Sequence, residues 1–389
     1  MNHAAFGLMA RADEVAAVAR LHADAVDKEG RFPVEAIEAL KRTQLLGAMI
    51  PTDCGGGGAS LETIAEICAI LGQACGSTAM IYAMHQIKAS SLVSHGLESP
   101  WHRDFMRRCA SEQLLLASAT TEGGVGGDLR NSICAVVRDG DVFDLDKDAT
   151  VISYALYADA ILVTSRRAPE AQSSDQVMSV VTREQISLDR TTGWDTLGMR
   201  GTCSEGFRLT ARAPVAQILP KPFAEIAAQS MLATSHLLWG SLWYGIAAAA
   251  LTRAQAYVRA EARRKPNVTP TGATRLVQGS ALLDSLKSAL ADGLARYEAA
   301  AATQDGLSSV SFAIAMNNVK INASETANAV IQHALMICGI MGYKNDTPFS
   351  VGRHLRDALS APLMISNDRI IANNANLMLA HRLGKRIVS

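Results

Sequence analysis

The chain has 389 residues, of which 49% are hydrophobic and 5% aromatic, and its 37 Lys and Arg residues balance 37 Asp and Glu residues. This zero net charge argues against a nucleic acid or an anionic membrane as the main partner. The seven cysteines are scattered without a C-x-x-C pair or a Cys/His cluster, so they indicate reduced thiols and no metal site. The N-terminus lacks a signal-peptide layout and no long apolar run is present, so we expect a cytoplasmic protein. At roughly 100–200 residues per domain, the length predicts two or three domains.

Residues 1–112 carry helical spacing and predict an N-terminal helical domain. Apolar residues recur at helical intervals over 8–30, which ends at a glycine, and over 32–51, which has a proline near its start. The run CGGGGAS at 54–60 cannot hold a helix and predicts a loop. Two further helices are expected over 60–96.

Residues 113–219 change character and predict an antiparallel β-domain. Short β-branched runs such as ADAILVTSR and VMSVVTRE are separated by turn signals such as RDGD. The helical period returns over 220–389, where long helical segments predict a bundle and RKPNVTPTG is the loop between the first two. We therefore expect an α+β fold that is mostly α, in the order helical domain, β-domain, helical bundle.

Several motifs occur in an order that is typical of one family. FPVEAIEALKRTQLLGAMIPTDCGGGG resembles an N-terminal helix followed by a P-x-x-x-G-G-x-G turn, and ATTEGGVGGD resembles a T-E-P-x-x-G-S-D loop. GWDTLGMRGTCSEGF is similar to a G-x-R-G-[ST] turn, and ALMICGIMGY with RHLRDA to an A-x-Q-x-x-G-G-x-G-Y … R-D-A stretch. Over residues 12–375 the chain thus resembles the acyl-CoA dehydrogenase superfamily. The resemblance implies an FAD-dependent oxidoreductase with a C-terminal four-helix bundle, assembled as a homotetramer or homodimer.

The resemblance also implies which residues bind the FAD ring. Thr121 and the amides around it are expected to face the pyrimidine edge of the isoalloxazine, whose carbonyl oxygens and N–H suit a hydroxyl and close backbone groups. TVISYA resembles the W-[IF]-[ST] strand of the family, so Ser153 is expected to hydrogen-bond flavin N5 or O4. Val151 stands where a tryptophan often packs on the ring. The alternative for the glycine-rich loop is a plain hairpin turn.

Other flavin contacts follow from the C-terminal motifs. Gln278 and Gly339 match the glutamine and the glycine turn that hold the adenine and pyrophosphate, partly across a subunit boundary. The chain departs from the family at Met336 and Ile340, and it places Glu261 where an arginine is usual.

The most informative departure concerns the catalytic base. Family members remove the α-proton of an acyl thioester with a carboxylate that lies shortly after R-D-A, within Y-E-G-[ST]. Here Ile365 takes the place of that glutamate, and its backbone amide is expected to bind the thioester oxygen of the substrate. Asn367 takes the place of the hydroxyl residue and is expected to contact the flavin. Asp368 comes three residues too late to replace the glutamate.

Three functions therefore compete. In the first, Glu261 serves as a relocated base for α,β-oxidation of an acyl thioester bound to coenzyme A or a carrier protein. In the second, the chain is a flavin monooxygenase or N-hydroxylase, and His85 acts as proton donor or acceptor. In the third, it is a flavoprotein that acts on an acyl thioester without dehydrogenating it. The intact RHLRDA and the STAMIYAMHQ segment favour the acyl-thioester function, with an electron acceptor that the sequence does not identify. A binding module that keeps no reducible FAD is the non-enzymatic alternative.

Overall fold

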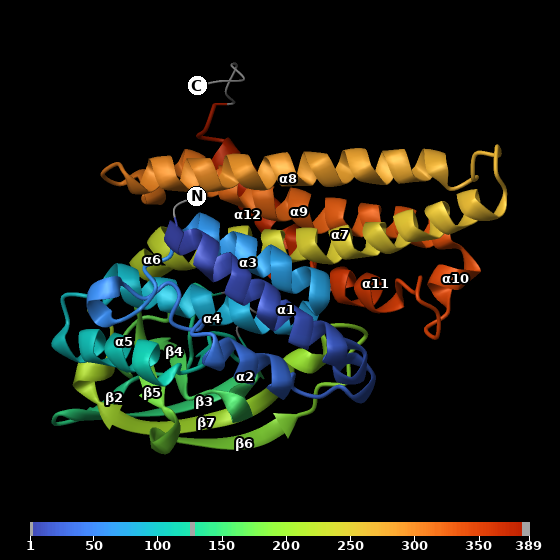
Figure 1. The fold of residues 1–389 in the computed structure, drawn as a ribbon. Helices are drawn as coiled ribbons and strands as arrows, with labels where there is room; N and C mark the ends of the chain where they lie inside the picture. Colours follow the sequence, from blue (N-terminus) through green and yellow to red (C-terminus); the bar gives the residue numbers. More distant parts are fainter. Residues whose placement is uncertain (1–2, 125–128, 383–389) are drawn as a thin grey trace. The chain divides into compact units, whose positions relative to one another are not determined.

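The computed structural model describes residues 3–124 and 129–382. The chain forms two compact units, Met1–Ser235 and His236–Ser389. Figure 1 labels the elements in chain order. In these described ranges no helix is both long and apolar enough to cross a membrane.

In the described residues five helices open the first unit, one more than the four that the sequence predicts. They are α1 (His3–Glu29), α2 (Val34–Arg42), α3 (Leu61–Ala74), α4 (Gly76–His95) and α5 (Pro100–Glu112). The Ser60 hydroxyl caps α3 by accepting a hydrogen bond from the Thr63 amide, and Pro100 begins α5 at the position where proline is favoured. In α4, 16 of 20 residues are buried, so its polar side chains must find partners inside the protein.

The glycine run between α2 and α3 is a loop, as predicted. A Cβ atom at Gly56 would lie 2.2 Å from the carbonyl oxygen of Ile50. Only glycine permits so close an approach of two backbone segments. The Gly58 amide donates to the same Ile50 carbonyl at 2.8 Å, which fixes the turn against the residues before it.

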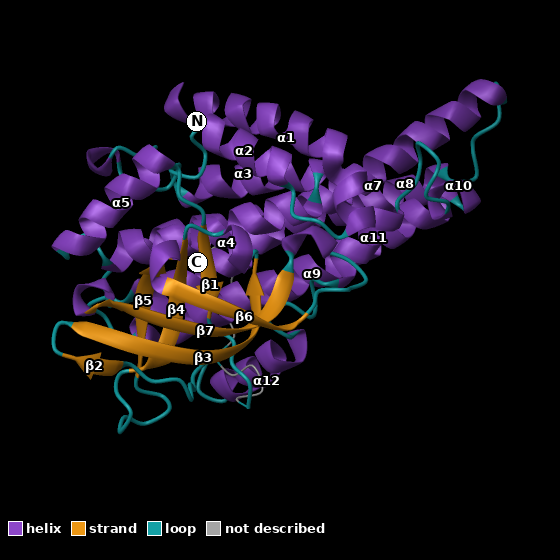
Figure 2. Cartoon of the chain, turned by 90° about the horizontal axis from the view of Figure 1, so that it is seen from below, coloured by secondary structure: helices purple, strands orange, loops and turns teal. Residues whose placement is uncertain are grey.

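In the part of the chain that the structure describes, seven strands follow and form two sheets (Figure 2). The first has the order β1-β4-β5, from β1 (Leu116–Ala119), β4 (Ala160–Arg166) and β5 (Gln176–Thr182). The second has the order β2-β3-β7-β6, from β2 (Val137–Asp139), β3 (Val142–Ser153), β7 (Ser204–Pro214) and β6 (Ile186–Thr192). The predicted antiparallel β-domain is confirmed with one difference. Strands β1 and β4 pair in parallel. Parallel neighbours need a long crossover connection, and the segment that contains β2 and β3 provides it.

The first unit ends in a feature that helical periodicity does not predict. After α6 (Phe223–Ile226), residues Ala227–Met231 form a π-helix, and α7 (Leu232–Arg264) continues from it. Single π-turns of this kind occur often at functional sites.

The second unit contains most of α7 and the remaining helices. They are α8 (Ala273–Ala301), α9 (Val310–Cys338), α10 (Ile340–Tyr343), α11 (Gly352–Leu359) and α12 (Asn367–Met378). A Cβ atom at Gly240 of α7 would lie 2.7 Å from a side-chain atom of Leu290 on α8 and 3.3 Å from Ala323 on α9, so these three helices pack closely there. The predicted C-terminal bundle is confirmed.

Short 3-10 turns connect the larger elements. They are Thr52–Cys54, Ala155–Tyr157, Arg183–Gln185, Arg200–Thr202, Val215–Gln217 and Gly306–Ser308. The division into domains 1–112, 113–219 and 220–389 stays a prediction.

Candidate functional site

A β-bulge in β3 positions the first predicted flavin residue. The register of β3 against β7 shifts between Ala149 and Ile152, which leaves the backbone of Val151 outside the strand ladder. The Thr121 hydroxyl donates to the Val151 carbonyl at 3.0 Å and accepts from the Val151 amide at 3.4 Å. These two bonds hold Thr121, the first residue of the T-E-G-G segment, against the bulge. The rest of the predicted loop, residues 125–128, lies outside the described ranges.

A buried carboxylate anchors the same segment. Glu122 accepts hydrogen bonds from Lys147, at 3.1 Å, from the Ser132 hydroxyl and from the Ile133 and Cys134 amides. Burial alone would raise the pKa of Glu122, but the Lys147 ammonium and these hydrogen bonds outweigh it and lower the pKa. The glutamate of the T-E motif is therefore a structural anion, and it fixes where Thr121 stands.

Ser153 belongs to a row of hydroxyl groups at the end of β3. Its Oγ lies 2.8 Å from Ser204 Oγ, which lies 2.8 Å from Thr202 Oγ1. The Thr202 hydroxyl in turn donates to the Met199 carbonyl at 2.9 Å. Each hydroxyl has one hydrogen, so with all three bonds formed Ser204 donates to Thr202 and Ser153 donates to Ser204. The Ser153 oxygen then has only lone pairs to offer a ligand.

The R-G-T turn that holds Thr202 is tied to the helices of the first unit. The Arg200 side chain donates to the Asp27 carbonyl at 2.8 Å, and the Gly201 amide donates to the Ser77 hydroxyl at 3.2 Å. These bonds fix the row of hydroxyls against α1 and α4.

His85 has a structural position. Its Nε2 lies 2.7 Å from the Leu46 carbonyl oxygen, and its Nδ1 accepts from the Leu116 amide at 3.0 Å. Burial lowers the pKa of His85 to about 4, so the ring is neutral at physiological pH. Both ring nitrogens are occupied, and the residue ties α4 to the start of β1. Its proposed proton transfer to a substrate stays a prediction that these contacts do not favour.

In the second unit, Ile365 lies in a turn gripped by a buried lysine. Lys320 of α9 is fully buried, and its Nζ donates to the Ile365 carbonyl at 2.7 Å and to Asn367 Oδ1 at 2.6 Å. The Asn367 amide nitrogen donates to Ser324 Oγ at 3.0 Å, which fixes the orientation of the amide. Ile365 has a φ of 49°, an unusual conformation for a β-branched residue. The Ile365 N–H has no hydrogen-bond partner among the described residues.

The Lys320 ammonium lies near one aromatic ring, and its charge acts on one histidine. Its Nζ lies 5.8 Å from the centre of a Trp243 ring, within range of a cation–π interaction. Burial lowers the pKa of Lys320 to about 8, while Glu325 opposes the shift. His236 Nδ1 lies 3.2 Å from the Met316 carbonyl oxygen, and burial lowers the pKa of His236 to about 4, with the Lys320 charge adding to the effect.

The other predicted residues of the second unit lie apart from the Lys320 cluster. Glu261, in the last turns of α7, forms an ion pair with Arg264 at 3.0 Å, and its side chain is 29% exposed. Gln278 is exposed on α8. Gly339 ends α9 with φ 54° and ψ −135°, a conformation that is essentially restricted to glycine.

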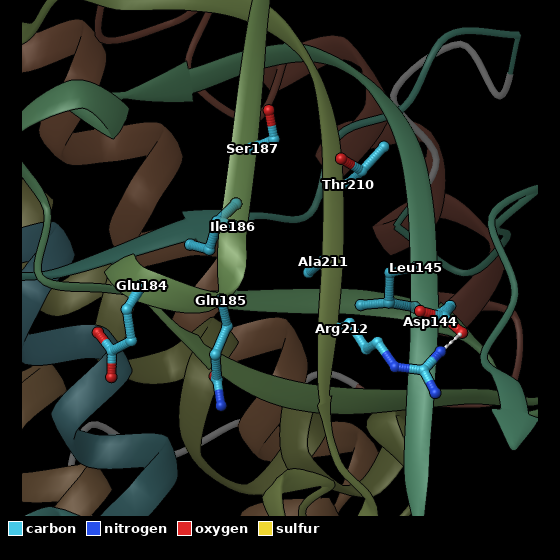
Figure 3. A pocket seen from close by; sticks show the side chains of 9 residues that line it. All are labelled: Asp144, Leu145, Glu184, Gln185, Ile186, Ser187, Thr210, Ala211 and Arg212. Atoms are coloured by element: carbon cyan, nitrogen blue, oxygen red, sulfur yellow. Dashed lines mark hydrogen bonds and ion pairs between the residues drawn. The ribbon is translucent and has the colours of Figure 1, made fainter.

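A shallow depression in the larger sheet does not coincide with any of these groups. It has a volume of about 490 Å³ and is lined by residues of β3, β6 and β7 together with Glu184 and Gln185 (Figure 3). Arg212 at its edge is paired with Asp144 and Asp139. Because its guanidinium is already ion-paired with two aspartates, Arg212 is poorly suited to bind a ligand there.

Comparison with known families decides the classification. Residues 7–113 match the acyl-CoA dehydrogenase N-terminal domain, and residues 226–365 match the acyl-CoA dehydrogenase C-terminal domain. The chain belongs to the acyl-CoA dehydrogenase superfamily. It is therefore a flavoprotein of oxidoreductase type, and the family predicted from the motifs is confirmed.

Members and fold relatives of this superfamily differ in their named reactions. The chain is 27% identical over 343 residues to "Probable acyl-CoA dehydrogenase YngJ" of Bacillus subtilis (strain 168), covering 87% of each chain. It is 27% identical over 377 residues to L-evernosamine nitrososynthase of a Micromonospora species, covering 89% of this chain and 84% of that one. The crystal structure of FMN-bound TdsC from Paenibacillus sp. A11-2 superposes with a TM-score of 0.85 at 20% identity, covering 97% and 98% of the two chains.

Several polar residues that hold the candidate site were not predicted from the sequence. Glu122 is part of the quoted T-E motif, but its partner Lys147 lies 25 positions away. Ser204 and Thr202 lie in the GTCSEG segment, and their hydroxyl side chains are the local feature that could have identified them as site residues. Lys320 lies in the sequence VKINAS, where nothing local marks it as a partner of a turn 45 positions later.

Proposed function

We propose that this chain is a flavin-dependent monooxygenase of the acyl-CoA dehydrogenase superfamily, acting on an amine or an aromatic carbon of a small organic substrate. The observation that carries the proposal is the turn at Ile365. The side chain at the place of the family's carboxylate base is aliphatic, and it cannot accept a proton. Oxygenation by reduced flavin and dioxygen does not need that base, whereas thioester dehydrogenation does.

The residues of the first unit fit a flavin. Thr121 and Ser153 offer hydroxyl oxygens on a rigid strand end, and the small Val151 leaves the flavin face open. The row of hydroxyls makes Ser153 a hydrogen-bond acceptor. An acceptor suits a flavin N–H, and reduction of a flavin adds an N–H at N5. A bound reduced flavin supplies two electrons to dioxygen, of which one oxygen atom enters the substrate and the other leaves as water.

In the second unit, Gln278, Gly339 and Asn367 are proposed cofactor contacts, with FAD as the form of the flavin. Because Gly339 has no side chain, a phosphate can approach the backbone at this turn closely. Asn367 is already oriented by Lys320 and Ser324. FMN is the alternative, since it is the flavin named in the TdsC structure.

Acyl-thioester α,β-dehydrogenation is the second candidate. The similarity to the Bacillus protein favours it, and so does the unpartnered Ile365 N–H, which would hydrogen-bond a thioester oxygen. It requires Glu261 as the base. An ion-paired, partly exposed carboxylate is poorly suited to remove a weakly acidic proton, and we therefore place this function second.

One pair of rapid-mixing experiments separates the two functions. We expect that an acyl-CoA panel, mixed anaerobically with the oxidised flavoprotein, leaves the flavin absorbance unchanged. We expect that the reduced flavoprotein, mixed with oxygen and candidate amines or indoles, yields a product heavier by one oxygen atom. Bleaching of the flavin by an acyl-CoA would overturn the proposal in favour of dehydrogenation. A protein that stays colourless when FAD or FMN is supplied would overturn both.

The proposed assembly is a homotetramer or homodimer. Large apolar side chains are exposed close to Gln278 and Gly339 in the sequence, namely Val277, Met336, Ile340 and Tyr343. Exposed apolar groups of this kind often lie at protein interfaces. Sedimentation velocity of the wild type and of Ile340→Glu tests this. A monomeric wild type would contradict the proposed assembly.

A further inference from the structure

Three lysines are buried in the described ranges, and one of them lacks an oxygen acceptor. Lys147 binds the Glu122 carboxylate, and Lys320 binds a carbonyl and an amide oxygen. Lys88 of α4 is only 5% exposed, and its Nζ has a single hydrogen-bond partner, the thioether sulfur of Met231 at 3.2 Å. A thioether is a weak acceptor, so the Lys88 ammonium is buried without the oxygens that satisfy the other two.

Among the described residues no carboxylate compensates the charge of Lys88. Burial alone lowers the pKa of Lys88, to about 8, with no contribution from a neighbouring acid. A large part of the amine population is therefore charged at neutral pH. A buried cation without a counterion destabilises a protein. An oxygen acceptor from outside the chain would supply the partner that this ammonium lacks.

The surroundings of Lys88 have the features of a polar binding site. Met231 ends the π-helix Ala227–Met231, and π-turns occur often where proteins bind ligands. The fully buried hydroxyls of Ser91 and Ser230 lie 3.5 Å apart. Each currently donates to a carbonyl of its own helix, Ser91 to Ile87 at 3.2 Å and Ser230 to Ile226 at 2.9 Å. Hydroxyls rotate readily, so both can turn to an incoming acceptor.

Met231 can leave the position that it occupies. A methionine side chain is unbranched and flexible, and its contact with Lys88 is weak. An oxyanion that replaces the sulfur would neutralise the ammonium and accept a charge-assisted hydrogen bond.

We propose that Lys88 is the binding site for a carboxylate group of a small organic ligand, with the hydroxyls of Ser91 and Ser230 as further donors and Met231 as the side chain that the ligand displaces. This site lies within the first unit, and no motif of the family marks it. The carboxylate belongs to a free small acid or forms the far end of an acyl chain.

The test compares ligands that differ only by a carboxylate. Adipoyl-CoA and hexanoyl-CoA have the same six-carbon chain, and adipate and hexanoate are the corresponding free acids. In at least one pair, we expect calorimetry to show that the wild type binds the ligand with the additional carboxylate, adipoyl-CoA or adipate, about tenfold more tightly than its hexanoyl counterpart. Lys88→Met should abolish this preference. It should also raise the melting temperature of the ligand-free protein, because it removes the buried charge.

Matched variants complete the experiment. Lys287→Met, at an exposed lysine of α8, should change neither the preference nor the melting temperature. Lys88→Gln is the second variant, for the case that methionine perturbs the fold. A preference in the CoA pair alone assigns the site to an acyl chain, and a preference in the free acids assigns it to a small acid. Equal binding of both members of each pair, or a preference that survives in both Lys88 variants, would overturn the proposal. Flavin content, measured in the same samples, reports separately on the proposed oxidoreductase function.

Discussion

The Nζ atom of Lys320 lies 2.7 Å from the carbonyl oxygen of Ile365 and 2.6 Å from Oδ1 of Asn367. One buried ammonium thus holds both sides of the turn that leads into α12. Ile365 has a positive φ, and strained residues persist only where their surroundings over-determine them. The hydrogen bonds from Lys320 restrain the turn, so Lys320 is a positioning residue for Ile365 and Asn367.

Replacement of Lys320 by methionine should loosen this turn. Lys320→Met removes the donor of the Ile365 carbonyl and leaves the Asn367 amide oxygen with only the longer bond from the Ser324 hydroxyl, at 3.4 Å. An unsatisfied buried acceptor costs about 1–3 kcal/mol. We expect amide hydrogen exchange to accelerate at least severalfold over residues 361–370, while the strands of the first unit keep their protection. Lys287→Met is the control. Unchanged exchange over 361–370 would show that Lys320 does not hold the turn.

The row of hydroxyls of Ser153, Ser204 and Thr202 should influence the reduction potential of a bound flavin. Ser153 donates to Ser204, so at the proposed flavin site its oxygen would accept a hydrogen bond from the ligand and stabilise a reduced flavin that carries the extra N–H. In Ser204→Ala, Ser153 is free to donate to the oxidised ring instead. With about 1 kcal/mol for such a bond, the two-electron midpoint potential should fall by about 20 mV.

Spectroelectrochemical titration of the holoprotein measures this shift. Ser187→Ala, at an exposed hydroxyl of β6, serves as the control and should leave the potential unchanged. A potential that rises in Ser204→Ala would mean that the hydrogen bonds run in the opposite direction.

The proposed oxygenation predicts that Glu261 is dispensable. Glu261 and Arg264 form a partly exposed pair, and such pairs contribute little to stability. Glu261→Gln should therefore leave both the product yield and the melting temperature close to wild type, and Arg264→Gln should do the same. Loss of turnover in Glu261→Gln, with Arg264→Gln active, would identify Glu261 as the base and would restore the dehydrogenation function.

The sequence predicts the helices and strands because their signals are local. Helical periodicity and the proline before α2 involve neighbours in the chain, and the aliphatic Ile365 is visible by its spacing from R-D-A. The roles of buried polar residues are different, because they depend on distant partners. The sequence around Lys88 and Lys320 does not indicate that Lys320 donates to oxygen atoms and Lys88 to the sulfur of Met231.

His85 illustrates the same limit at the predicted site. Its sequence context suggests a group free to exchange protons, but the amide of Leu116 and the carbonyl of Leu46 occupy both ring nitrogens. The π-helix before α7 is a further case, since its residues continue the apolar pattern of an α-helix without a break.

Buried neutral histidines should make the protein sensitive to acid. Burial lowers the pKa of His85, His102 and His236 to about 4, against about 6.5 in an unfolded chain. Between these values the unfolded chain binds more protons than the folded one. The stability that each neutral ring contributes is complete above pH 6.5 and is lost as the pH falls toward 4.

His236 is suitable for replacement, since its Nε2, like that of His102, has no partner among the described residues. In His236→Gln the loss of stability on acidification should be smaller, by up to about 3 kcal/mol at pH 4 relative to pH 7. Urea unfolding of the second unit at a series of pH values measures the difference. His22→Gln is the control, because that ring is 40% exposed. If the wild type and His236→Gln lose stability in parallel from pH 7 to pH 4, His236 is not held neutral by the fold.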